Sequence, residues 1–107
     1  MVSPMTSRLD QLRKLHDADA SDPFVTYGIA LEHAKAGDRD EALRWLDETL
    51  KLDADYCYAY FQKGRLLGEL GREEEARQAV RAGIERAKAA GDAHAASELE
   101  GLLESLG

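Results

Sequence analysis

The chain contains very little cysteine and proline, and it has no long apolar run. Cys57 is the single cysteine among 107 residues, which excludes an internal disulfide and a zinc site built from several cysteines. Pro4 and Pro23 are the only prolines, so long uninterrupted helices are allowed. The longest apolar run covers residues 56–61, which is too short to cross a bilayer.

The composition also limits the partners that the chain can have. Residues 1–8 lack the apolar core of a signal peptide, so we expect a reduced, cytoplasmic setting. Hydrophobic residues make up 44% and charged residues 33%, which predicts a folded chain rather than a disordered one. The formal net charge of −7 opposes binding to nucleic acid, which needs a basic face. We therefore expect neither nucleic acid nor a membrane as a partner.

Helical periodicity runs through the whole chain, and no segment alternates as a strand would. Short polar or glycine-containing breaks divide it into six predicted helices. One lies before residue 18, and the others cover about 23–36, 39–52, 56–70, 72–90 and the segment after 92. Each predicted helix but one follows a residue that can cap its first turn, namely Thr6 or Ser7, then Asp22, Asp38, Asp55 and Asp92.

The sequence repeats itself with a period of 34 residues. Three residues of the segment 23–56 recur in the segment 57–90, because Gly37, Glu41 and Ala42 correspond to Gly71, Glu75 and Ala76. Apolar positions follow the same spacing, as in the series Leu12, Leu46 and Val80. We therefore expect these apolar positions to be buried in equivalent places of successive helix pairs.

This pattern resembles the tetratricopeptide repeat family, whose unit of 34 residues is a helix–turn–helix. Small residues occupy that family's close-packing positions and glycines its turn, at Ala30, Gly37, Ala42, Gly64, Gly71 and Ala76. The first unit departs from the family at Thr26, where a large aromatic such as Tyr60 of the second unit is preferred. The resemblance implies an all-α fold, an α-α superhelix or solenoid of about six antiparallel helices in three pairs.

The repeat register predicts a single domain over residues 1–107. Residues 7–22 are expected to form a half repeat, 23–56 the first full repeat and 57–90 the second. Residues 91–107 do not continue the pattern. They are expected to form a helix that caps the apolar end of the array.

The residues that could carry chemistry do not form a catalytic constellation. Cys57 lies in a first helical turn, where the helix dipole favours a thiolate, but no histidine is near it in sequence to act as a base. A packing role is therefore predicted for Cys57, and a core position for His33. His94 and Glu98 are spaced as an i, i+4 pair, but two ligands do not close a metal site. We predict no enzyme activity, no metal and no cofactor.

The resemblance implies that a peptide binds along the concave surface made by the first helix of each repeat. The family's contact positions correspond to Phe24, Tyr27, Leu31, Lys35, Tyr56, Tyr58, Phe61 and Arg65. We expect Tyr27 and Phe61 to face away from the core, so that their truncation opens no cavity. Lys35 and Arg65 are expected to orient acidic groups of the partner. The family's clamp for a C-terminal carboxylate is not met, because Tyr27, Leu31 and Phe61 occupy its other places.

The predicted function is that of a non-catalytic scaffold or interaction module for a protein or peptide. The alternative is a structural protein that associates with itself, as a homodimer through the same aromatic surface. An exposed aromatic surface is costly in water, so something must cover it. The N-terminal segment, a second copy of the chain and a different partner are the three candidates.

Overall fold

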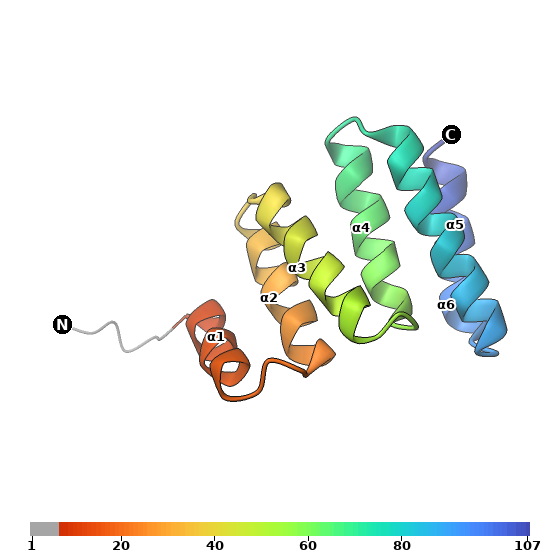
Figure 1. Cartoon of the computed structure of the whole chain (residues 1–107). Helices are drawn as coiled ribbons and strands as arrows, with labels where there is room; N and C mark the ends of the chain where they lie inside the picture. The colour runs from red at the N-terminus through yellow and green to blue at the C-terminus, as the bar shows by residue number, and fades with distance from the viewer. Residues whose placement is uncertain (1–6) are drawn as a thin grey trace. The chain divides into compact units, whose positions relative to one another are not determined.

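The computed structural model describes residues 7–107, and this part of the chain folds into six α-helices without a strand (Figure 1). This confirms the predicted all-α helical repeat fold. None of the described helices combines the length and the apolar character that a membrane span requires. The helices are α1 Arg8–Ala18, α2 Pro23–Lys35, α3 Arg39–Leu52, α4 Cys57–Glu69, α5 Glu73–Ala89 and α6 Ala93–Ser105.

Most of the predicted caps are present at the starts of the helices. Ser7 Oγ accepts a hydrogen bond from Asp10 N at 3.1 Å, and Asp22 Oδ1 accepts one from Phe24 N at 2.9 Å. Asp92 Oδ1 caps α6 by accepting from Ala95 N at 3.0 Å. These side chains satisfy amide groups that the first turn leaves unpaired. The alternative cap at residue 6 lies outside the described residues.

The predicted cap at Asp55 is wrong. The N-cap of α4 is Tyr56, whose side chain makes no capping hydrogen bond. The carboxylate of Asp55 instead pairs with Arg86 on α5, at 3.2 Å between Oδ1 and Nη1. This contact between residues 31 positions apart competes with the local one, and the local sequence gives no sign of it.

Glycine ends α2 and α4 in the way that the repeat pattern predicts. Gly37 has a φ of +85° and Gly71 a φ of +77°, a region that residues with a side chain rarely adopt. After each glycine the chain bonds back to the helix, from Asp38 N to His33 O and from Arg72 N to Leu67 O, both at 2.9 Å. These bonds close the helix ends and reverse the chain into the next helix.

The chain divides into two compact units, Met1–Leu52 and Asp53–Gly107. In the first unit α2 packs against both α1 and α3. Leu12, Val25 and Ile29 form a buried cluster that Leu9 and Trp45 partly cover. The small residues Ala30 and Ala42 are also fully buried, as the predicted close approach of α2 and α3 requires.

A pair of buried threonines replaces the aromatic residue that is missing from the first unit. Thr26 Oγ1 lies 2.8 Å from Thr49 Oγ1, and both side chains are completely buried. Thr26 Oγ1 is also 3.0 Å from Pro23 O, and Thr49 Oγ1 is 2.8 Å from Trp45 O. The two hydroxyl protons serve two of these three contacts at a time, so the threonine that donates across the pair gives up the bond to its own helix. The pair links α2 to α3.

The second unit is organised around glycines on α4 and α5. A Cβ atom at Gly64 would lie 2.3 Å from Val80 Cγ2, so only glycine permits this approach of the two helices. A Cβ atom at Gly83 would lie 2.6 Å from Cβ of Tyr60, whose hydroxyl donates to Ala54 O at 2.8 Å. The aromatic ring at residue 60 thus lies over a glycine of α5.

Helix α6 packs against both α4 and α5 of the second unit. Leu99 is almost fully buried, in a cluster with Cys57, Val80, Ala87, Ala95 and Ala96. Ser97, Glu100 and Glu104 on the remainder of α6 are exposed. The helix therefore has one apolar side against the unit and one polar side.

Candidate partner-binding surfaces

Four of the predicted site residues follow one another along α2 of the first unit. Phe24, Tyr27, Leu31 and Lys35 are spaced at i, i+3, i+7 and i+11, so they share one face of the helix, which we call the α2 surface. Phe24 is 65% exposed, the largest exposure among the large apolar side chains described. Tyr27 and Leu31 are half-buried. The α2 surface thus presents apolar groups of which one is clearly uncovered.

The predicted cation of the α2 surface is engaged by its own helix. Lys35 Nζ lies 3.5 Å from Glu32 Oε2, and Arg8 Nε of α1 lies 3.6 Å from the same oxygen. The Lys35 side chain is 72% exposed, so its pair with Glu32 is a surface contact that a partner can replace at little cost.

The other four predicted residues belong to the second unit. Tyr56 is half-buried and precedes α4, while Tyr58, Phe61 and Arg65 lie on α4 itself. The Tyr58 hydroxyl donates to Glu98 Oε1 of α6 at 3.3 Å, and His94 Nε2 lies 3.2 Å from that same oxygen. Partial burial and then the charge of Glu98 raise the pKa of Tyr58. One hydrogen bond therefore ties this end of α4 to α6.

Phe61 does not face away from the core as expected. It is half-buried and packs against the apolar cluster that includes Cys57, Val80 and Leu99. The physical reason is that this cluster is built from α4, α5 and α6 together, and Phe61 lies on the part of α4 that packs against it. Truncation of Phe61 therefore removes core contacts as well as surface.

Arg65 donates three hydrogen bonds to side chains of its own helix, α4. Its Nε and Nη2 donate to Gln62 Oε1 at 3.2 and 2.7 Å, and its Nη1 donates to Glu69 Oε2 at 2.8 Å. Beside it is a shallow groove of about 310 Å³ between α4 and α6. We call this the α4–α6 groove, and its lining consists of Arg65, Gly68, Glu69, Glu73, Leu102, Ser105 and Leu106.

The sequence did not reveal the contribution of α6 to this surface. Glu98, Leu102 and Leu106 lie after residue 90, where the period of 34 residues ends, so no contact position of the family could be assigned to them. The available signal was the apolar stripe of the last helix, which indicates burial but does not say which neighbour it meets.

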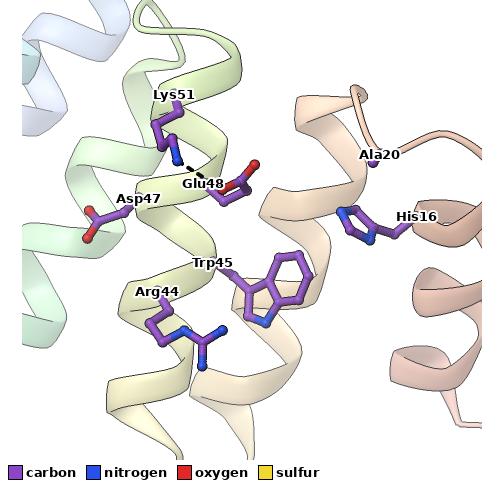
Figure 2. Close-up of a pocket in the computed structure, with 7 residues that line it drawn as sticks. All are labelled: His16, Ala20, Arg44, Trp45, Asp47, Glu48 and Lys51. Carbon is purple, nitrogen blue, oxygen red and sulfur yellow. Dashed lines mark ion pairs between the residues drawn. The ribbon is translucent and has the colours of Figure 1, made fainter.

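A second groove, of about 420 Å³, lies on the first unit between α1 and α3 (Figure 2). His16 of α1 faces the indole of Trp45, with the ring centroids 5.0 Å apart and the planes at 88°. Around the rings the charges balance, since Arg44 and Lys51 stand against Asp47 and Glu48. The sequence predicted no role for this groove.

The residues considered for chemistry occupy separate places. Cys57 is buried in the apolar cluster, and burial, followed by the charges of Asp92 and Asp55, raises the pKa of its thiol. The predicted packing role of Cys57 is confirmed, and a thiolate is disfavoured. His33 is buried, as predicted. Among the described residues, no group of three or more His, Cys, Asp or Glu side chains could hold a metal ion.

Comparison with known proteins decides the family. Residues 58–89 match the family model described as Tetratricopeptide repeat. The crystal structure of a tetratricopeptide repeat domain protein from Salinibacter ruber is 33% identical, and the match covers 79% of this chain and 96% of that one, with a TM-score of 0.74. The chain belongs to the tetratricopeptide repeat family.

Two further structures are similar to this tetratricopeptide repeat protein. A solution NMR structure of the Salinibacter ruber domain gives a TM-score of 0.76 at 33% identity, covering 82% of this chain and 89% of that one. A solution structure from Bordetella parapertussis gives a TM-score of 0.83 at 25% identity, covering 95% and 89%. A search of curated proteins gives no match. Repeats of this family generally mediate protein–protein interaction and are non-catalytic.

Proposed function

We propose that this tetratricopeptide repeat protein is a non-catalytic module that binds a protein or peptide partner through the faces of α2 and α4. Phe24, 65% exposed at the start of the α2 surface, is the observation that supports this most directly. Full burial of such a side chain is worth roughly 1.5–3 kcal/mol, so its exposure favours a partner that covers it. The adjoining half-buried Tyr27 and Leu31 would extend the contact.

Phe24→Ala tests the proposal without disturbing the fold, because the side chain makes few contacts within the chain. We expect an unchanged melting temperature and a partner affinity at least about 30-fold lower, since an aromatic anchor contributes about 2 kcal/mol or more. The measurement is capture of partners from the native cell extract on the immobilised protein, alongside circular dichroism melting.

Leu15→Ala is the matched control, because Leu15 is a 55% exposed apolar residue of α1 outside the α2 surface. It should retain every captured partner. Light scattering on a sizing column separates the self-association alternative, for which Phe24→Ala would convert a dimer to a monomer. Partners that survive the loss of Phe24 would place the function on another surface.

A further inference from the structure

The α4–α6 groove has an apolar floor and an open side. Leu102 and Leu106 of α6 supply the floor, and both are half-buried. A Cβ atom at Gly64 would lie 3.4 Å from Leu102 Cδ2, and one at Gly68 would lie 2.9 Å from Leu106 Cδ2. The leucine side chains therefore lie directly over the glycines of α4, and the groove continues past them to Arg65 and Glu69.

Gly68 lets the Leu106 side chain lie close against α4, although packing does not strictly require a glycine there. Gly64 and Gly83 are required, because a Cβ atom would meet Val80 at 2.3 Å and Tyr60 at 2.6 Å. At Gly68 the only such contact is the tip of a flexible leucine in the last turn of α6. A glycine inside a helix lowers helix stability. An alanine at this position would push Leu106 outward, so the glycine helps to set the position of the groove floor.

The charges around the groove favour a basic occupant. Arg65 donates to Gln62 and Glu69. Arg77 of α5 donates to Glu74 at 3.1 Å and to the backbone carbonyl of Leu106 at 3.5 Å. Glu73, at the start of α5, is exposed, and its side chain has no ion pair or hydrogen bond within the described structure. No Lys or Arg occurs after residue 88, while four acidic residues do.

We propose that the α4–α6 groove receives an apolar side chain of the partner, flanked by a Lys or Arg that pairs with Glu73. The apolar side chain lies on Leu102 and Leu106, beside Gly68. The inference rests on the proposed function, and it specifies which side chains of the partner the α4–α6 groove would bind. It differs from the expectation that Arg65 attracts acidic groups, because that guanidinium already donates to Gln62 and Glu69, whereas Glu73 has no such partner in the described part of the chain.

Two synthetic peptides that differ only in charge test the selectivity. One carries a leucine between two lysines, and the other carries the same leucine between two glutamates. Titrated into the ¹⁵N-labelled full chain, the lysine peptide should shift the amide signals of Gly68, Leu102 and Leu106. Its affinity should exceed that of the glutamate peptide by about fivefold, and the difference should shrink in high salt. Equal shifts from both peptides, or shifts elsewhere on the chain, would overturn the proposal.

Paired variants separate charge from shape. Glu73→Lys should remove the preference for the lysine peptide, whereas Glu85→Lys, 12 residues and roughly 18 Å further along α5, should keep it. Gly68→Ala should weaken binding of the lysine peptide about tenfold or more, because the added methyl group pushes Leu106 outward into the groove. Gly101→Ala changes a glycine whose Cβ would meet nothing within 4 Å, and it should have no effect on binding.

Capture of native partners distinguishes a failure of this inference from a failure of the proposed function. If partners are lost with Phe24→Ala but retained with both Gly68→Ala and Glu73→Lys, the α4–α6 groove is not used and the inference is wrong, while the interaction module stands. If none of the three variants changes the captured partners, both proposals fail. Loss of partners with Gly68→Ala and Glu73→Lys, together with the peptide preference, supports the inference.

Discussion

Gly64 and Gly68 lie one turn apart on α4, yet a methyl group would meet different surroundings at the two positions. At Gly64 it would meet the branched, fully buried side chain of Val80, which cannot move without disturbing the core. At Gly68 it would meet only the end of Leu106, which is half-buried in the last turn of α6. The same substitution should therefore change stability in opposite directions.

We expect Gly64→Ala to lower the free energy of unfolding by about 1–3 kcal/mol through overpacking. Gly68→Ala should raise it by roughly 0.5–1 kcal/mol, because alanine is the better helix former and the neighbouring leucine can yield. Urea unfolding followed by circular dichroism measures both variants against the wild type. A destabilised Gly68→Ala would mean that Leu106 is held firmly, and the groove would then owe its shape to packing alone.

The buried threonine pair shows how much the sequence predicts at the scale of single residues. Thr26 was recognised as a departure from the family, because a large aromatic is preferred at its position. Its partner Thr49 lies 23 residues away at a position with no such preference, so the 2.8 Å contact between the hydroxyls could not be predicted. A local sequence pattern shows which residue departs from the family, but the partner that satisfies its buried hydroxyl group is set by tertiary packing.

At the scale of helices, the sequence predicts that six helices exist, in which order they come and where most of them begin and end. The caps at Ser7, Asp22 and Asp92 depend on atoms within three residues of each other, so the local sequence contains all that decides them. The predicted cap at Asp55 is wrong because the carboxylate of Asp55 forms an ion pair with Arg86 of another helix. Helix boundaries are thus predictable where local hydrogen bonds have no distant competitor.

The attachment of α6 to the second unit depends strongly on one leucine. Leu99 is 1% exposed and belongs to the same buried cluster as Cys57. We expect Leu99→Ala to cost about 2–5 kcal/mol, the usual range for a buried leucine. The change should lower the urea midpoint, and it should speed the reaction of the single thiol with a thiol reagent in native buffer.

Leu70→Ala serves as the control for Leu99→Ala, since Leu70 ends α4 with 38% exposure. Its effect should stay within about 0.5 kcal/mol, as for other surface substitutions. If both leucine variants leave the thiol of Cys57 equally protected, α6 does not shield the cluster in solution.

Across the whole molecule, the repeat register predicted site residues that share one helix face in the first unit, whereas in the second unit they include residues held by packing and polar contacts. In the first unit the predicted residues share the α2 surface and include the exposed Phe24. In the second unit, Phe61 packs against the apolar cluster that α6 helps to form, and Tyr58 donates a hydrogen bond to Glu98 of α6. A periodic pattern predicts equivalent contacts in successive repeats. It could not predict the contacts of α6, because this helix lies outside the repeated segments.

The two units also differ in how protonation affects them. In the first unit, hydrogen bonds from Ser21 lower the pKa of Asp19. In the second unit, burial raises the pKa of the thiol of Cys57 above its ordinary value of 9.0, and that of Tyr60 above 10.0. The folded second unit therefore holds these protons more tightly than the unfolded chain does.

This difference predicts a loss of stability in alkali that Cys57 helps to cause. Because the folded-state pKa values are raised, the stabilisation is complete below about pH 9 and is lost as the pH rises through them. Urea midpoints measured by circular dichroism from pH 7 to 10.5 should fall for the wild type. The urea midpoint of Cys57→Ala, which lacks the ionising thiol, should fall less steeply above pH 9, whatever the stability of this variant at pH 7. General repulsion from the growing negative charge acts on both proteins alike, so parallel curves would mean that Cys57 ionises as freely in the folded chain as in the unfolded one.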